Sequence, residues 1–309
     1  MSMPHAIRTP TRLDLILMVM TALMLASGFV AIRVVAQETG PLWLAASRVS
    51  ISLLVLLPYA IWRGMVWPAT RRQWATITGM AMLTVVVPFF LTAWAGRTIE
   101  AGVLSLLMGS GPFLALIGSH FMTIDDRMTT RKIVSVLLGF SGIMALVGPS
   151  MVAGLGGGAL AAKLAVLGAT FSYVIAGLLI RRIAMPPVRL ACLVLAIGTA
   201  ILIPLALIAE SPPLAGLSTP ALGALIYLGL IPTGLAYILR FTLIRNIGYS
   251  RFSLSSNLIP VFGVALGVIV LGEPLSLKLI IALTMVLAGL IIASGGKKPQ
   301  SLPQSGENA

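Results

Sequence analysis

The sequence contains very little charge. Only 9% of its 309 residues are charged, and eight residues are acidic, whereas 58% are hydrophobic. About a quarter of the residues of an ordinary soluble domain are charged, so the composition excludes that class. The apolar residues form long runs that recur from end to end, which is typical of a helical protein that crosses a bilayer many times. A membrane β-barrel is disfavoured because its strands alternate polar and apolar residues.

Acidic residues are scarce and confined to particular places. All eight lie at the end of an apolar run, in a loop or in the C-terminal tail, and none lies at the centre of a run. Carriers coupled to protons or sodium usually hold a carboxylate near the middle of the bilayer. The sequence therefore predicts a facilitator or exchanger rather than a proton-coupled carrier. The single cysteine, Cys192, lies inside an apolar run, so no internal disulfide is expected.

Groups for catalysis inside the membrane are also missing. The sequence has no HExxH motif and no pair of acidic residues within an apolar run. Ser110 and His120 share one run, but the helix between them spans about 15 Å, which is beyond hydrogen-bond range. We therefore expect no enzyme, no catalytic residue, no metal and no cofactor.

Ten apolar segments are long enough to cross a bilayer as helices. They cover about 13–34, 41–62, 73–94, 101–122, 131–149, 160–181, 187–209, 220–242, 249–271 and 275–294. The predicted fold class is therefore an all-α integral membrane protein of ten transmembrane helices. Residues 296–309 are polar and are predicted to form a disordered cytoplasmic tail.

The 21 basic residues divide unevenly between the two sides of such a bundle. Sixteen fall at the termini and in every second loop, and the other side holds only Arg33, Arg48, Arg97, Lys163 and Lys278. Basic loops stay in the cytoplasm, so both termini are predicted to be cytoplasmic, in a multi-pass protein of the inner (plasma) membrane. The net charge of +13 is then an orientation signal and does not indicate nucleic-acid binding.

The two halves of the sequence resemble each other. Residues 41–58 align without a gap with 187–204, and residues 105–112 align with 253–260, each of the latter pair running from serine to proline. This indicates two five-helix units, 1–150 and 151–295. Because five is odd, the second unit enters the membrane from the opposite side, which makes an inverted repeat of the kind found in transporters.

Matching helices interrupted by proline or glycine are the best sequence indication of a transport site. Proline frees a backbone carbonyl inside a helix, and we interpret such carbonyls as ligands for an ammonium group, with Asn257 or helix N-terminal amides for a carboxylate. Gly263 and Gly267 have the spacing of close helix contact and are interpreted as packing. The predicted cavity residues are Met24, Ser27, Phe90, Ser105, Gly109, Ser110, Pro112, Tyr173, Thr233, Tyr237, Ser253, Ser256, Asn257 and Pro260.

Two arginines lie inside predicted helices. Arg240 follows Thr233 and Tyr237 on one helix face near the cytoplasmic end, and we expect its side chain to extend to the interface. Arg48 lies about 10 Å into its helix. We prefer the interpretation that it also extends outward; the alternative is an ion pair with Glu38 or Glu100.

Three stretches resemble one transporter family when taken in order along the chain. They are Ala26-Ser-Gly-Phe-Val-Ala-Ile-Arg33, Leu44-Ala-Ala-Ser-Arg48 with the apolar run to Pro58, and the proline-bearing helices with an acidic turn such as Leu271-Gly-Glu-Pro274. Together they resemble the EamA-type ten-helix transporters of the drug/metabolite transporter (DMT) superfamily, although Ala26 replaces the family's tryptophan. The resemblance implies that the fifth and tenth helices are peripheral. The protein is expected to be a monomer, or a homodimer formed through Gly139, Gly142 and Gly289.

The predicted function is transport of small organic metabolites by alternating access through a central cavity. The sequence is similar in general character to the YddG-like amino-acid exporters of that superfamily, which favours amino acids, aromatic ones included. The alternatives are a multidrug or nucleotide-sugar exchanger of the same fold and, in other classes, an intramembrane enzyme or a passive assembly protein. The expected partners are a small-molecule substrate and the lipid bilayer.

The absence of a mid-membrane acid gives a first testable prediction. In proteoliposomes loaded with substrate, we expect solute flux to follow the substrate's own gradient, because no titratable carboxylate lies where a coupled proton would bind. Proton flux is measured beside solute flux with a pH-sensitive dye. Proton movement in fixed proportion to the solute would contradict the prediction.

Overall fold

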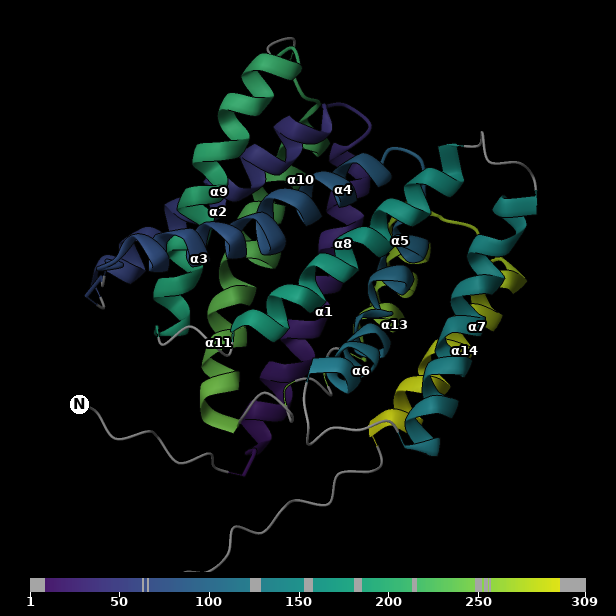
Figure 1. The fold of residues 1–309 in the computed structure, drawn as a ribbon. Coiled ribbons are helices and arrows are strands. Elements are labelled where there is room, and N and C mark those ends of the chain that lie inside the picture. Colours follow the sequence, from purple (N-terminus) through teal and green to yellow (C-terminus); the bar gives the residue numbers. More distant parts are fainter. Residues whose placement is uncertain are drawn as a thin grey trace, which may run out of the picture.

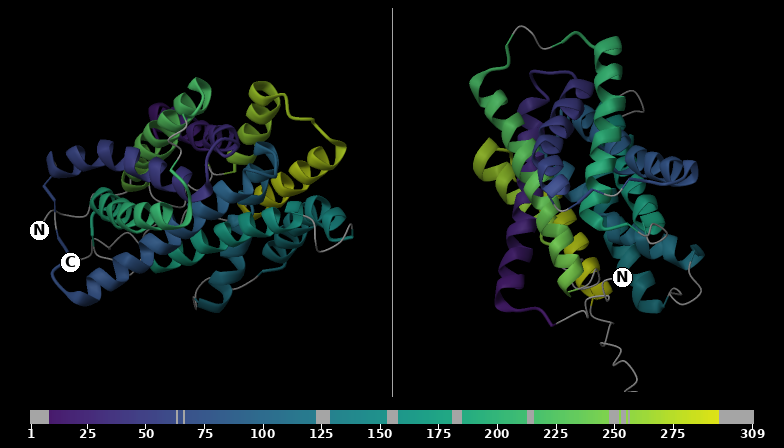
Figure 2. Two further views of the ribbon diagram at one scale, coloured as in Figure 1. Left: turned by 90° about the horizontal axis from the view of Figure 1, so that it is seen from above. Right: turned by 90° about the vertical axis from the view of Figure 1, so that its left-hand side faces the viewer.

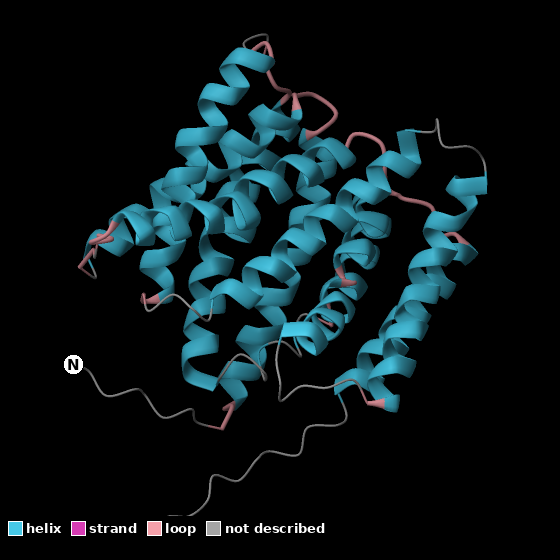
Figure 3. Ribbon diagram, viewed as in Figure 1, coloured by secondary structure: helices cyan, strands magenta, loops and turns pink. Residues whose placement is uncertain are grey.

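The computed structural model describes residues 9–62, 64–65, 67–122, 129–152, 158–180, 185–212, 216–247, 252, 255 and 257–294. Every element in these ranges is a helix (Figure 3). In chain order the helices are α1 (Arg12–Val35), α2 (Pro41–Trp62), α3 (Arg71–Ala81), η1 (Met82–Val86), α4 (Val87–Ala95), α5 (Ala101–Met108), α6 (Gly111–Met122), α7 (Thr130–Val152), α8 (Gly158–Ile180), α9 (Pro187–Ala209), α10 (Thr219–Leu228), η2 (Gly229–Leu235), α11 (Ala236–Ile247), α13 (Ile259–Leu271) and α14 (Leu277–Ser294).

The predicted segments coincide with these helices to within a few residues, apart from the first part of 249–271, most of which lies outside the described residues. Seven helical runs are long and apolar enough to cross a membrane, and three shorter apolar stretches begin at Ala101, Ile259 and Leu277. The exact number of crossings stays a prediction. The predicted tail, 296–309, also lies outside the described residues.

Two continuous helical runs contain a turn of π-helix, which the sequence did not predict. The turn η1 lies between α3 and α4, and η2 lies between α10 and α11, so each interrupts the third helix of a predicted repeat. Pro232 lies within η2, and Pro88 is the second residue after η1. Proline cannot donate to the carbonyl four residues earlier, and a local π-turn is a common adjustment to that loss inside membrane helices.

At one end of the bundle, carboxylates cap helix N-termini. Glu210 accepts hydrogen bonds from the second and third backbone N–H groups of α2 at 3.0 and 3.1 Å. Glu273 accepts from the first two N–H groups of α5 at 2.6 and 2.9 Å. Helix N-termini carry unpaired N–H groups and a partial positive charge, so a carboxylate stabilises them. The start of α1 and the last turn of α14 lie at the other end of the bundle (Figure 1).

The same end contains two further acids with shifted pKa values. Glu38 accepts hydrogen bonds from the hydroxyl and the N–H of Ser218, at 2.6 and 2.7 Å, and these bonds lower the pKa of Glu38. Burial, and then repulsion by Glu273, raises the pKa of Glu100, which directly precedes α5. The prediction that acids lie at segment ends is confirmed for the described part of the chain. Their role as caps was not predicted.

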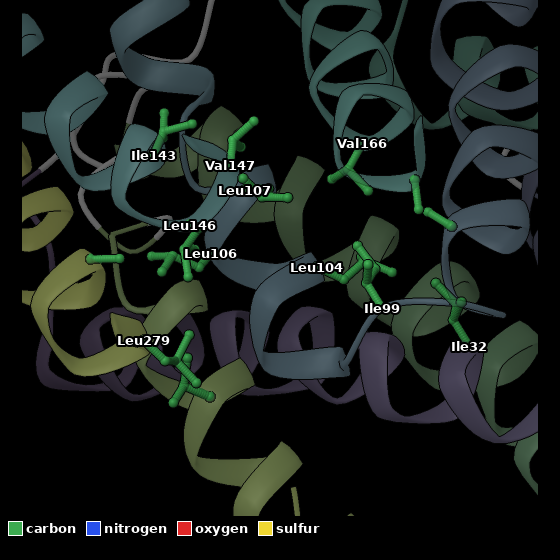
Figure 4. Packing of buried hydrophobic residues seen from close by; sticks show 14 of the residues in the cluster. Ile32, Ile99, Leu104, Leu106, Leu107, Ile143, Leu146, Val147, Val166 and Leu279 are labelled. Carbon is green, nitrogen blue, oxygen red and sulfur yellow. The ribbon is translucent and has the colours of Figure 1, made fainter. Parts of the chain in front are cut away.

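The buried hydrophobic residues form two main clusters. One joins α1, α4, α5, α7, α8, α13 and α14, with Leu104, Leu106 and Leu146 among its members (Figure 4). The other joins α2, α3, α4, α8 and α9 and includes Val49 and Phe89. The second cluster borders the polar residues described below.

Glycines on α7 and α14 pack within the chain. The two helices lie side by side at one edge of the bundle, seen from above in Figure 2. A Cβ atom added at Gly142 would lie 2.8 Å from the carbonyl oxygen of Ala282, and one at Gly289 would lie 2.8 Å from that of Ser135. Gly139 is in contact with the Phe113 ring. The prediction that these glycines form a dimer surface is therefore wrong, because their faces are occupied by the chain's own side chains and backbone.

This contact gives a prediction about stability. We expect Gly142→Ala to lower the free energy of unfolding by about 1–3 kcal/mol, the usual cost of overpacking, because the backbone of α14 cannot yield as a side chain would. Gly223→Ala is the matched control, since nothing lies within 4 Å of its added Cβ. Removing an exposed helical glycine is expected to be neutral or stabilising by up to about 1 kcal/mol. Melting of both variants in detergent checks the difference, and equal melting temperatures would contradict it.

Candidate functional site

Arg48 of α2 is buried among the helices, with 8% of its surface exposed. Its Nε donates a hydrogen bond of 2.7 Å to Thr233 Oγ1, and its guanidinium carbon lies 3.8 Å from the centroid of the Phe89 ring. The prediction that Arg48 extends outward is therefore wrong. The alternative, an ion pair with Glu38 or Glu100, is not formed either. Among the described residues, the Arg48 side chain makes a hydrogen bond to Thr233 only.

The acceptor for Arg48 exists because of a proline. Pro232 has no N–H, so the carbonyl of Leu228, four residues earlier, loses its helical donor. The Thr233 hydroxyl donates to that carbonyl at 2.8 Å, and the Ser52 hydroxyl donates to the next carbonyl, of Gly229, at 2.8 Å. Once its proton is directed to Leu228, Thr233 Oγ1 presents its lone pairs to Arg48. The sequence of η2 thus places one oriented acceptor inside an apolar bundle.

Small residues allow η2 to approach its neighbours closely. A Cβ atom added at Gly229 would lie 3.3 Å from the carbonyl oxygen of Arg48 and against Ile51. A Cβ atom at Gly28 of α1 would lie 3.1 Å from Pro232 Cβ. Close approach through glycine is usual where membrane helices are held together by polar contacts. It brings α2 near enough for the arginine to reach Thr233.

Two tyrosines lie near Arg48, and a second arginine lies near one of them. Tyr173 of α8 and Tyr237 of α11 pack against the hydrophobic cluster that contains Phe89. Tyr173 lies within electrostatic reach of Tyr237, Arg48 and Arg240. We call Arg48, Tyr173, Thr233, Tyr237 and Arg240 the arginine–tyrosine cluster. Tyr173, Thr233 and Tyr237 were predicted site residues, and the structure brings them together.

Arg240 is half-buried, and the expectation that it extends to the interface stays a prediction. Its Nε is buried and has no hydrogen-bond partner in the described part of the chain. A buried polar group without a partner costs about 1–3 kcal/mol, and more when it is charged. The cluster therefore contains guanidinium donors that the described protein does not satisfy. Chemically, it can bind oxygen acceptors.

A second group of predicted site residues meets where α5 and α13 cross. Ser105 is in contact with Gly263, and Gly109 is in contact with Pro260. Ser105, Gly109 and Pro260 are buried against each other's helices. The interpretation of Gly263 as a packing residue is confirmed, and Gly267 likewise lies against the carboxylate of Glu273 and against α5.

The two helix breaks also match, as the repeat predicted. A turn at Gly109 and Ser110 separates α5 from α6, and a turn at Asn257 and Leu258 precedes α13. Ser110 is fully buried, and its hydroxyl has no hydrogen-bond partner among the residues described. Pro112 and Asn257 are half-buried beside these turns.

The remaining predicted site residues lie elsewhere or are not described. Ser27 shares a hydrogen bond of 2.7 Å with the Tyr227 hydroxyl of α10, and Met24 accepts from Ser27 through its carbonyl. Met24 and Phe90 are half-buried. Ser253 and Ser256 lie outside the described residues. Arg48 and Phe89 were missing from the predicted site, and the signal that could have found Arg48 is a charge within an apolar segment.

Comparison with known proteins gives a consistent result. A model of the EamA-like transporter family matches residues 12–148 and again residues 159–295. The chain is 24% identical over 196 residues to the uncharacterized transporter YoaV of Bacillus subtilis, covering 63% of this chain and 66% of YoaV. It is 22% identical to the uncharacterized transporter YvbV of the same organism, covering 77% of each chain. An uncharacterized transporter of Archaeoglobus fulgidus is 27% identical over 63% of this chain and 68% of its own length.

A crystal structure shares the fold. It superposes with a TM-score of 0.65 at 21% identity, covering 92% of this chain and 97% of the other. At this identity the likeness concerns the fold alone. Nearly the whole chain is therefore arranged as in a known structure.

The geometry around Arg48 gives a prediction of its own. Thr233→Val removes the hydroxyl and leaves the Arg48 Nε–H without its acceptor. We expect a loss of about 1–3 kcal/mol in the free energy of unfolding for this unpaired donor. Thr233→Ser keeps the hydroxyl and is the matched control, expected to lose much less. Thermal unfolding of the purified variants in detergent is the measurement, and equal loss in both would show that the methyl group matters rather than the hydrogen bonds.

Proposed function

The chain belongs to the EamA-like transporter family, and on that premise we propose that it carries small organic metabolites across a membrane by alternating access. The observation that carries the proposal is a polar cluster inside a largely apolar bundle, in which Arg48 and Thr233 are buried and Tyr173, Tyr237 and Arg240 are half-buried. Intramembrane ionisable groups are costly and mark substrate pathways by default. Membership in a transporter family supplies the class of function.

We propose amino acids, aromatic ones included, as the substrates, as in the YddG-like exporters. Phe89, Tyr173 and Tyr237 present aromatic rings beside the arginine. Aromatic rings favour contact with apolar and aromatic side chains, and a guanidinium is suited to a carboxylate. These two kinds of surface match the two ends of an aromatic amino acid.

The matched breaks support alternating access. The turns at Gly109–Ser110 and Asn257–Leu258 interrupt equivalent helices, and η1 and η2 interrupt another equivalent pair. We propose that the two five-helix units rock against each other about these interruptions, in an inverted arrangement with both termini in the cytoplasm. The protein is then an exporter or facilitator of the inner membrane and not an enzyme.

A transport assay tests the proposal directly. The purified protein is reconstituted in vesicles and tested for exchange of radiolabelled amino acids, nucleotide sugars and cationic drugs. We expect amino acids to exchange, and no exchange of any of these solutes would overturn the function.

Two substitutions then test the proposed site, one in the arginine–tyrosine cluster and one in the turn before α13. We expect Tyr237→Ala and Asn257→Ala to reduce exchange by about tenfold, since loss of a ring contact or a hydrogen bond costs about 1 kcal/mol or more. Tyr59→Ala in α2 is the control, because Tyr59 lies beside Trp62 and about 16 Å by helix rise from Arg48 on the same helix. Unchanged exchange in both test variants, at equal protein in the vesicles, would discredit the site.

A further inference from the structure

The arginine–tyrosine cluster contains two cations and no acid from the described part of the chain. Every described acid lies at a helix end. Asp14 closes the capping box of α1 with Thr11 at 2.7 Å. The other described acids lie at the end of the bundle opposite the start of α1, and they are Glu38, Glu100, Glu210 and Glu273.

Arg48 also has donors to spare. A guanidinium has five N–H donors, and Arg48 uses only its Nε–H, on Thr233. Its two terminal nitrogens make no hydrogen bond to the residues that the structure describes, although only 8% of the residue is exposed. Arg240 adds a buried Nε that also lacks an acceptor. An arginine that served packing alone would be expected to have its donors satisfied.

Acceptors that would suit an ammonium group are, by contrast, already used. Pro232 frees the carbonyl of Leu228, but the Thr233 hydroxyl donates to it. The neighbouring carbonyl of Gly229 is taken by the Ser52 hydroxyl. These two carbonyls of η2 are therefore not free acceptors for an ammonium group.

We propose that the arginine–tyrosine cluster binds the anionic oxygen group of the substrate, a carboxylate or a phosphate. The protein then carries organic anions and carboxylate-bearing zwitterions and rejects organic cations. This inference rests on the proposed transport function and adds the charge class of the solute.

The physical basis is charge compensation in a place of low dielectric constant. A guanidinium buried inside a bundle has lost its hydration, and an incoming anion supplies a counter-charge and acceptors in place of the lost water. Arginine binds carboxylate and phosphate groups through paired N–H donors, which adds orientation to attraction. A cation would meet two arginines without a counter-charge.

Binding is tested with four probes that differ in charge. They are 3-phenylpropionate, an anion; L-phenylalanine, a zwitterion; L-phenylalaninol, a cation of the same size; and UDP-glucose, which carries phosphate. The readout is the rise in melting temperature of the purified full-length protein in detergent. We expect phenylpropionate and phenylalanine to bind at least tenfold more tightly than phenylalaninol. Preferential binding of UDP-glucose would assign the oxyanion as phosphate, whereas equal binding of phenylalaninol, or no binding of any probe, overturns the inference.

Variants separate recognition from a structural role. We expect Arg48→Gln to bind phenylpropionate at least tenfold more weakly, Arg48→Lys to retain part of the preference for anions, and Arg240→Gln to weaken the preference without loss of the Arg48–Thr233 bond. Arg72→Gln, at an exposed position of α3, is the control. If Arg48→Gln does not fold, the charge preferences of Arg240→Gln and Arg48→Lys test the inference instead. Unchanged charge preference in both of these overturns the inference.

Uptake of the same probes into vesicles distinguishes this inference from the function on which it rests. If anions bind through Arg48 but no probe is carried, the transport function falls and the binding site stands. If all probes are carried regardless of charge, the function stands and the inference falls.

Discussion

The hydrogen bond between Arg48 and Thr233 depends on a chain of constraints that begins with one proline. Pro232 removes a backbone donor, Thr233 repairs the loss at the Leu228 carbonyl, and the same hydroxyl then accepts from Arg48. Without that acceptor, a cation exposed by only 8% would lie among apolar side chains. An unpaired buried charge typically destabilises a protein by about 3–5 kcal/mol. The π-turn, the close glycine contacts and the position of the arginine are therefore parts of one arrangement.

Polar groups in this bundle have two separate tasks. At one end, Glu210 and Glu273 each satisfy two N–H groups at the start of a helix from a distant part of the chain. These carboxylates tie α2 and α5 to their neighbours and are consumed by that task. Arg48 remains buried, and Arg240 half-buried, without an acidic partner from this end. The separation of the few acids from Arg48 and Arg240 gives the interior its positive character.

Much of the fold could be predicted from the sequence, because the length of each apolar run indicates a helix and the basic residues of each loop indicate its side of the membrane. The helix positions, the matched breaks before Pro112 and Pro260, and the packing role of Gly263 followed from local patterns. The burial of Arg48 did not, because helix rise gives depth but not the direction of the side chain. At η2 the hydroxyls of Ser52 and Thr233 bond to the carbonyls of Gly229 and Leu228, and no local sequence pattern connects these two helices. Gly142 was assigned to a dimer because a small-residue face is the same whether its partner belongs to the chain or to a second copy.

The Arg48–Thr233 bond joins the two regions that the family model matches, since Arg48 lies in 12–148 and Thr233 in 159–295. A motion that separates these regions must therefore break this bond, or move Arg48 and Thr233 together so that the bond is kept. An anion bound at the free guanidinium nitrogens would leave the Nε–H on Thr233, so the solute and the joint between the regions would share one side chain. Binding would then alter the charge at the Arg48–Thr233 contact between the two regions. A ligand shifts a conformational equilibrium only when its contacts differ between the two conformations. The arginine is thus placed where recognition of the solute and movement of the two regions can be coupled.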